Sequence, residues 1–221
     1  MSMGMTKAPA AATKNLPSWR LISMMTAAGA IAGLLIVSVY QLTLPRIQHH
    51  QGEVMAGAIA EVLKAPVRLD TLYLRDGKLV KQLPQGTTSK GLERVFLGYD
   101  REGRRIGFAL SATESGFQEP VTVMFGYDAK AHSVIAMRVI ANKETPGLGD
   151  KIGKDTMFIN EFKGVVTPIA GAKADRKTVA PDEVVMITGA TISSRAVIQI
   201  INNAIKRWQP LIDAYGEGSK S

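Results

Sequence analysis

The stretch that decides the fold is VVMITGATISSRAVIQIINNAIKRW, residues 184–208, whose pattern changes near its middle. The short apolar run 184–187 is typical of a β-strand, and the turn residues Thr-Gly-Ala-Thr follow it. Beyond residue 195, apolar residues recur at helical spacing, which predicts an amphipathic helix that ends or kinks at Pro210. Its apolar face comprises Ala196, Val197, Ile200, Ile201, Ala204, Ile205 and Trp208. We therefore expect a strand that leads through a turn into a helix packed on a sheet.

The sheet itself is expected from the preceding region, where short apolar runs alternate with turn residues. Runs 72–74 and 105–110 each adjoin a turn pair of an acidic residue and glycine. Two longer runs, 121–127 and 133–140, flank a polar connection and predict a β-hairpin. The expected fold class is α+β, with an antiparallel sheet and packed helices.

An apolar segment near the N-terminus predicts a membrane anchor. Leu21 to Leu44 contains no charged residue, and a helix of this length spans about 36 Å, enough for a bilayer core of about 30 Å. Trp19 and Tyr40 lie near its two ends, where aromatic rings favour the headgroup zone, and Pro45 is expected to stop the helix. The segment therefore reads as one transmembrane helix.

The charges that flank this segment predict its orientation. Lys7, Lys14 and Arg20 precede it, so the positive-inside rule keeps the tail 1–20 in the cytoplasm. In a bacterium, the chain then crosses the inner membrane once and its C-terminal domain lies in the periplasm. A cleaved signal peptide ending near Ala30-Ile31-Ala32 is the alternative, but the apolar run exceeds the usual h-region of about 7 to 15 residues. We favour the retained anchor.

Near-helical apolar spacing continues between residues 46 and 65, just before Pro66. The complete division expected from the sequence is a cytoplasmic tail 1–20, a transmembrane helix 21–44, a membrane-proximal helix 45–68, a folded periplasmic domain 69–215 and a polar tail 216–221.

Composition excludes several classes of function. The chain has no cysteine, so thiolate zinc sites, iron-sulfur clusters and c-type haem attachment are ruled out. The net charge of +8 is partly due to the N-terminal tail, and no basic helix stripe or aromatic-interleaved basic strand suggests a nucleic-acid partner. We expect no nucleic acid, no metal site and no catalytic residue on this chain.

Two segments are candidates for ligand binding. The first, ETPGLGDKI at 144–152, concentrates glycines that permit a close backbone approach. Its glycine spacing loosely resembles a dinucleotide-binding turn, but Pro146 disturbs the junction, and an ordinary loop is favoured from the residues alone. The second places four hydroxyls, those of Thr188, Thr191, Ser193 and Ser194, at the start of the C-terminal helix. Helix caps and a phosphate site both suit this pattern, and four hydroxyls favour a phosphate-bearing ligand.

Together the two segments resemble the motifs of the FMN-binding domain family. That family includes the G subunit of the Rnf ion-translocating oxidoreductase and the C subunit of the sodium-pumping NADH:quinone oxidoreductase. The resemblance implies that FMN is attached through a phosphoester to Thr191, the last residue of the Thr-Gly-Ala-Thr motif. It also implies that the first segment lies against the flavin. The implied cofactor-binding residues are Thr188, Gly189, Ala190, Thr191, Ser193, Ser194, Glu144, Thr145, Gly147, Leu148 and Gly149.

One position departs from the family pattern. The family often has an aspartate three residues before the first motif hydroxyl, where this chain has Val185. This residue bears on recognition by the enzyme that attaches the flavin.

The resemblance further implies an electron-transfer subunit of a membrane-bound oxidoreductase complex of the Rnf type. Its partners would be other integral membrane and redox subunits, and a flavin-attaching transferase during maturation. Two alternatives stay open at this point. One is a membrane-tethered domain that binds FMN or another phosphate ligand noncovalently, as a sensor or scaffold. The other is a hydrolase that uses Ser193 or Ser194 with His132, although no Gly-x-Ser-x-Gly elbow is present.

Overall fold

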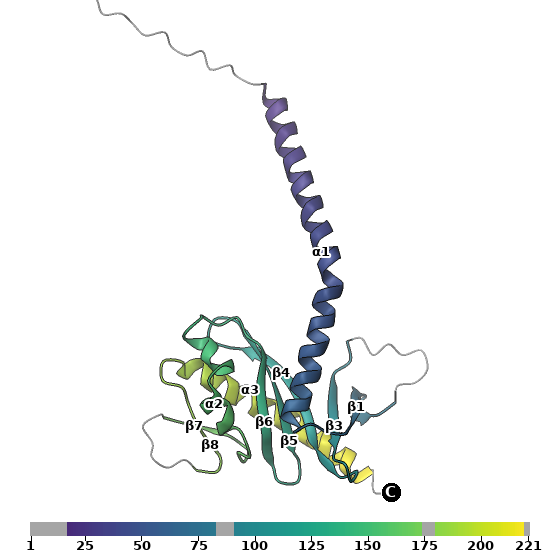
Figure 1. The fold of residues 1–221 in the computed structure, drawn as a ribbon, viewed down its shortest axis with the longest axis vertical. Coiled ribbons are helices and arrows are strands. Elements are labelled where there is room, and N and C mark those ends of the chain that lie inside the picture. The colour runs from purple at the N-terminus through teal and green to yellow at the C-terminus, as the bar shows by residue number, and fades with distance from the viewer. Residues whose placement is uncertain (1–16, 83–90, 174–179, 219–221) are drawn as a thin grey trace, which may run out of the picture. The chain divides into compact units, whose positions relative to one another are not determined.

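The computed structural model describes residues 17–82, 91–173 and 180–218 and divides into two units, Met1–Gln51 and Gly52–Ser221 (Figure 1). The helix α1, Ser18–Val62, begins in the first unit and ends in the second. Among the described residues, α1 is the one helix long and apolar enough to cross a membrane. The anchor expected from the sequence is therefore part of a longer helix.

The expected helix stop at Pro45 is wrong, because α1 continues through this proline to Val62. A proline removes one backbone N–H and crowds the preceding turn, but it does not prevent helical dihedrals in the residues that follow. The residues after Pro45 have the apolar spacing of a helix, so they continue α1. The membrane-proximal helix is thus continuous with the apolar segment instead of separate from it.

The second unit contains a six-stranded antiparallel sheet in the order β2-β1-β3-β4-β5-β6. The strands are β1 Arg68–Arg75, β2 Lys78–Val80, β3 Arg94–Tyr99, β4 Arg105–Ser115, β5 Pro120–Asp128 and β6 Ser133–Ala141. The predicted hairpin is confirmed, since β5 and β6 pair antiparallel across the connection between them. The α+β class is likewise confirmed.

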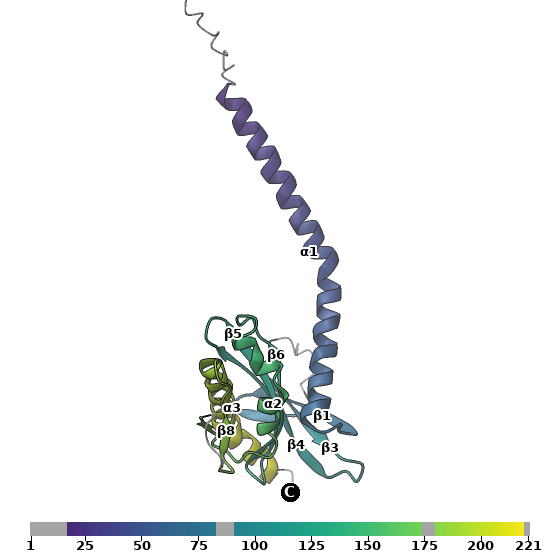
Figure 2. The same ribbon diagram turned by 60° about the vertical axis from the view of Figure 1, so that its left-hand side comes forward.

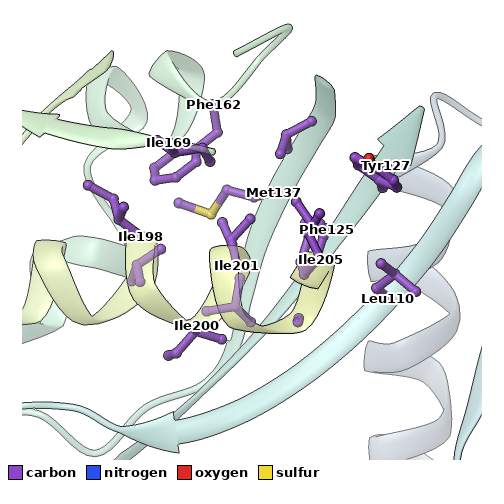
Figure 3. Close-up of a cluster of buried hydrophobic side chains, with 14 of the residues drawn as sticks. Leu110, Phe125, Tyr127, Met137, Phe162, Ile169, Ile198, Ile200, Ile201 and Ile205 are labelled. Atoms are coloured by element: carbon purple, nitrogen blue, oxygen red, sulfur yellow. The ribbon is translucent and has the colours of Figure 1, made fainter. Parts of the chain in front are cut away.

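The long helix α3, Thr191–Gly218, covers one face of this sheet. Its Ile201 and Ile205 point toward the strands, as Figure 3 shows. There they meet buried side chains of β5 and β6, among them Phe125 and Met137. The apolar periodicity of the sequence therefore located the core face of α3, although the helix runs past Pro210 to Gly218 instead of ending there.

The opposite face of the sheet is covered by the last turns of α1, residues 52–62 (Figure 2). Val62 packs there with Met124 of β5, whose neighbour Phe125 points to the α3 side, as strand alternation requires. The approach is close, because a Cβ at Gly126 would lie 2.3 Å from the carbonyl oxygen of Val62. The end of α1 thus belongs to the folded domain.

Four short elements between β6 and α3 were not predicted in full. They are the 3-10 helix η1 Gly149–Gly153, the helix α2 Thr156–Glu161, and the strands β7 Ala170–Ala172 and β8 Glu183–Val185. The strand expected at 184–187 corresponds to β8, which pairs in parallel with β7. Asp155 begins α2 by accepting hydrogen bonds from the amides of Met157 and Phe158. These elements carry the chain from the sheet edge to the start of α3.

Candidate functional site

The two glycine-containing segments lie together in space and enclose a cavity of about 310 Å³. The first segment, 144–152, follows β6 and includes most of η1. The second segment, 188–194, joins β8 to α3 and includes its first turn. A third segment, the β4–β5 connection, also reaches the cavity. The lining residues are Phe117, Glu144, Thr145, Leu148, Gly149, Gly189, Ala190, Thr191, Ile192 and Ser193.

Glu144 ties the three segments together. Its side chain is buried, with only 4% of the residue exposed. Oε1 accepts hydrogen bonds from the backbone amides of Phe117 at 2.6 Å and Gln118 at 3.2 Å. Oε2 accepts one from the Ser193 hydroxyl at 3.4 Å. A buried carboxylate requires such donors, so Glu144 fixes the β4–β5 connection against the first turn of α3.

Asp150 holds the Pro-Gly turn of the first segment. Its Oδ1 accepts from the amide of Gly147 at 2.7 Å, and its Oδ2 accepts from Lys154 Nζ at 2.6 Å. The hydrogen bond from Lys154, helped by that from Gly147 and opposed by burial, lowers the pKa of Asp150 below its ordinary 3.8. Gly147 has a φ of +79°, a conformation that favours glycine. The loop is therefore fixed before any ligand binds.

The start of α3 presents its hydroxyls in two directions. Ser193 and Ser194 are buried, and Ser194 Oγ accepts a hydrogen bond from the amide of Ile187 at 3.2 Å. Thr188 and Thr191 are exposed. The Thr191 hydroxyl donates to the carbonyl of Ile187 at 3.5 Å, a long and therefore weak contact. Of the four residues that carry these hydroxyls, Thr191 and Ser193 line the cavity, and of these two only Thr191 is exposed.

The structure brings most of the predicted site residues together. Eight of them line the cavity, namely Glu144, Thr145, Leu148, Gly149, Gly189, Ala190, Thr191 and Ser193. Thr188, Gly147 and Ser194 lie outside the lining, and the contacts above give Gly147 and Ser194 roles in shaping the loop and the helix start.

Two lining residues were missed by the sequence reasoning, Phe117 and Ile192. Both are large apolar residues that are more than half exposed, at 58% and 54%, and Leu148 is 54% exposed beside them. Ile192 lies inside the quoted motif and could have been included. Phe117 has no comparable signal, because only the fold of β4 and β5 brings it to the cavity.

The hydrolase alternative does not fit this geometry. His132 Nδ1 lies 3.2 Å from the hydroxyl of Tyr127 and 3.2 Å from Nε2 of Gln209. Gln209 is about 24 Å along α3 from Ser193, at 1.5 Å per residue. The histidine and the serines are therefore too far apart to form a nucleophile and its base.

Comparison with known proteins identifies the domain. Residues 116–206 match the family model of the FMN-binding domain. This span begins at the β4–β5 connection, includes both segments that line the cavity, and ends within α3. This part of the chain is therefore similar to the FMN-binding domain.

Curated relatives are similar over most of the chain. The chain is 28% identical over 193 residues to the G subunit of the ion-translocating oxidoreductase complex of Aliivibrio fischeri, covering 86% of this chain and 90% of that protein. It is 24% identical over 188 residues to the protein of the same name in Methanosarcina acetivorans, covering 84% and 92%. The similarity to these G subunits extends over most of both chains.

Solved structures support the fold. The C subunit of the Na(+)-translocating NADH-quinone reductase of Parabacteroides distasonis superimposes with a TM-score of 0.56 and 21% identity, covering 74% of this chain and 94% of that one. NqrC of Shewanella oneidensis gives a TM-score of 0.54 at 16% identity, covering 70% and 87%. Together with the apolar helix, the similarity to the G subunits and to the FMN-binding domain supports a membrane redox subunit.

The cavity residues fit FMN by their chemistry. The apolar side chains of Phe117, Leu148 and Ile192 suit a flat aromatic ring, and the N-terminus of α3 suits a phosphate. The cavity wall is tightly packed at Gly149, where a Cβ would lie 2.7 Å from Glu144 Oε2 and 2.8 Å from Ser193 Oγ. A glycine is therefore needed at this point of the wall.

Proposed function

We propose that this chain is the electron-transfer subunit of an Rnf-type ion-translocating oxidoreductase complex and carries FMN linked by a phosphoester to Thr191. The observation that carries the proposal is the position of the Thr191 hydroxyl. It is exposed, lies at the first residue of α3 and lines the cavity shared by both motif segments.

The local chemistry supports attachment at Thr191. The first backbone amides of a helix have no intrahelical acceptor, so they are available to phosphate oxygens beside this hydroxyl. Attachment forms a bond between Oγ and the flavin-side phosphorus of a flavin dinucleotide, while the phosphoanhydride bond breaks and the other half leaves as a nucleoside monophosphate. The hydroxyl proton leaves to a base of the flavin-attaching transferase. The weak contact of Thr191 with Ile187 costs little to give up.

The bound FMN would supply the redox chemistry, and the chain would supply position and surroundings. Leu148, Phe117 and Ile192 would exclude water from the ring, and Thr145 and Glu144 would hold the walls in place. Thr145 does so by donating to Gln118 Oε1 at 2.8 Å. No residue of this chain needs to act as an acid or base in electron transfer.

The membrane topology follows from the flanking charges. The tail 1–20 would lie in the cytoplasm and the FMN-binding domain in the periplasm, with α1 crossing the bacterial inner membrane once. A single anchor would keep the flavin beside other integral membrane and redox subunits. The names of the relatives, as subunits of ion-translocating complexes, support such partners.

In-gel flavin fluorescence tests the attachment. The full chain is expressed with a flavin-attaching transferase, denatured and run on a gel. Wild type should fluoresce and Thr191→Val should be dark. Thr156→Val is a matched control that should fluoresce, because Thr156 is an exposed threonine at the first residue of α2, outside both motif segments and the cavity lining.

Two other outcomes would contradict the proposal. A fluorescent Thr191→Val band would place the flavin on another residue. A dark wild-type band, in a host where a known relative is fluorescent, would favour the alternative of a tethered domain that binds FMN or another phosphate ligand noncovalently as a sensor or scaffold.

A further inference from the structure

Arg195 lies one helical turn beyond Thr191. Residues four apart on a helix share a face, with their Cβ atoms about 5 to 6 Å apart. Thr191 and Arg195 are both exposed, whereas Ser193 and Ser194 between them are buried. The guanidinium group of Arg195, on its long side chain, is therefore within reach of a group attached to the Thr191 hydroxyl.

Arg195 has no partner within the described residues, neither a hydrogen bond nor an ion pair. The other arginine of α3 is different. Arg207 forms an ion pair with Glu93, and its Cζ lies 5.6 Å from the ring of Trp208. Near the N-terminal end of a helix, a cation also faces the positive end of the helix dipole. Arg195 is thus an exposed cation near the start of α3 that no carboxylate of the described residues pairs with.

The acidic residues of the site do not supply that anion. Glu144 is directed inward to two backbone amides and Ser193. Asp150 is neutralised by Lys154 and the amide of Gly147. Both carboxylates are buried, while Arg195 is exposed. Neither carboxylate therefore pairs with Arg195, and its guanidinium group stays available to an anion bound at Thr191.

We propose that Arg195 binds the phosphate of the flavin at Thr191 and selects phosphate-bearing flavins over those without phosphate. The inference rests on the proposed function and adds a residue to it. A phosphate esterified to Thr191 keeps a negative oxygen on the helix face that Arg195 shares. A guanidinium group suits it, because its planar fork donates two parallel hydrogen bonds to phosphate oxygens.

The test compares Arg195→Gln, Arg195→Lys and the control Lys206→Gln in the full chain. Lys206 is an exposed cation of the same helix, about 22 Å beyond Thr191 and outside the screening length of about 8 Å. Two readouts are needed, the initial rate of flavin attachment and the rise in Tm that attachment produces. Arg195→Gln should slow attachment about tenfold and remove much of the rise in Tm. Arg195→Lys should be intermediate, and Lys206→Gln should match wild type.

The two readouts separate the competing explanations. A slower rate with an unchanged rise in Tm would overturn the inference, because Arg195 would then serve the transferase and not the phosphate. Unchanged rate and unchanged rise in Tm would also overturn it. The difference between wild type and Arg195→Gln in the rise of Tm on attachment should become smaller as the salt concentration is raised, as expected of an exposed charge pair.

Failure of the proposed function is distinguishable from failure of this inference. If wild type takes up no covalent flavin, the attachment is wrong, and noncovalent binding of FMN and riboflavin to the same variants decides the role of Arg195. A preference for FMN that is lost in Arg195→Gln but kept in Lys206→Gln would support it. Equal binding of both flavins to wild type would overturn it.

Discussion

The two segments that enclose the cavity are built in opposite ways. In the segment 144–152, the carboxylates of Glu144 and Asp150 are buried and accept hydrogen bonds from backbone amides and neighbouring side chains. In the segment 188–194, the hydroxyls of Thr188 and Thr191 are exposed, and of these two residues Thr191 lines the cavity. The first segment therefore contributes to stability and shape, and the second presents the group available for chemistry. Substitutions in the two segments should separate these properties.

The largest effect on stability is expected for Glu144→Ala. Removal of this buried carboxylate leaves the partly buried amides of Phe117 and Gln118, and the Ser193 hydroxyl, without their acceptor. The free energy of unfolding should fall by about 3 kcal/mol, measured as a lower urea midpoint at unchanged slope. Thr191→Val should change it by less than about 0.5 kcal/mol, because Thr191 is exposed.

The conservative variant Glu144→Gln sharpens this prediction. It retains one acceptor oxygen for the two amides, so it should lose less stability than Glu144→Ala. Equal losses in Thr191→Val and Glu144→Ala would contradict the division of roles between the segments.

A somewhat smaller loss is expected for Gly149→Ala. The added Cβ would lie within 2.8 Å of Ser193 Oγ and 2.7 Å of Glu144 Oε2, and both residues are buried. Overpacking of this kind costs about 2 kcal/mol, again visible in the urea midpoint. Gly57→Ala in α1 is the control, since nothing lies within 4 Å of its added Cβ, and it should stabilise slightly. An unchanged urea midpoint in Gly149→Ala would show that the cavity wall has room for the added Cβ.

The smallest effect should appear only in acid. The pKa of Asp150 is lowered below 3.8 by Lys154, so its contribution to stability is complete above pH 3.8 and is lost as the pH falls through the lowered pKa. Asp150→Asn should remove this part of the pH dependence, measured as Tm from neutral pH down through pH 3.8.

Asp100→Asn is a matched control outside the site, because Arg104 lowers the pKa of Asp100 in the β3–β4 turn. Both variants should flatten the acid dependence of Tm, but only Asp150→Asn should also alter flavin fluorescence in the loaded protein. An altered flavin signal in Asp100→Asn would refute the local role assigned to Asp150.

Much of this architecture could be predicted from residue patterns. The core face of α3, the β5–β6 hairpin and the apolar segment of α1 follow from periodicity and turn residues, which are local properties of the sequence. The motif likewise singled out Thr191, which lines the cavity, and its role as the attachment site stays a prediction. Pattern alone failed at Pro45, where the residues on both sides favour a helix strongly enough for α1 to continue.

The rest of the site depends on contacts distant in the sequence. Phe117 reaches the cavity because Glu144, far along the chain, binds its amide. The serines at 193 and 194 resemble Thr191 in chemistry, yet helix geometry buries them and leaves Thr191 exposed. Local patterns record neither the partner of a buried carboxylate nor the direction in which a hydroxyl points.

Peptide mapping by mass spectrometry tests the central claim most directly. Trypsin should release residues 178–195 as one peptide, which contains Thr188, Thr191, Ser193 and Ser194. From wild type loaded in a host with the transferase, this peptide should carry the mass of FMN less one water, and fragmentation should place it on Thr191. FMN on another residue of this peptide, or an unmodified peptide from a protein that still binds FMN, would contradict the account.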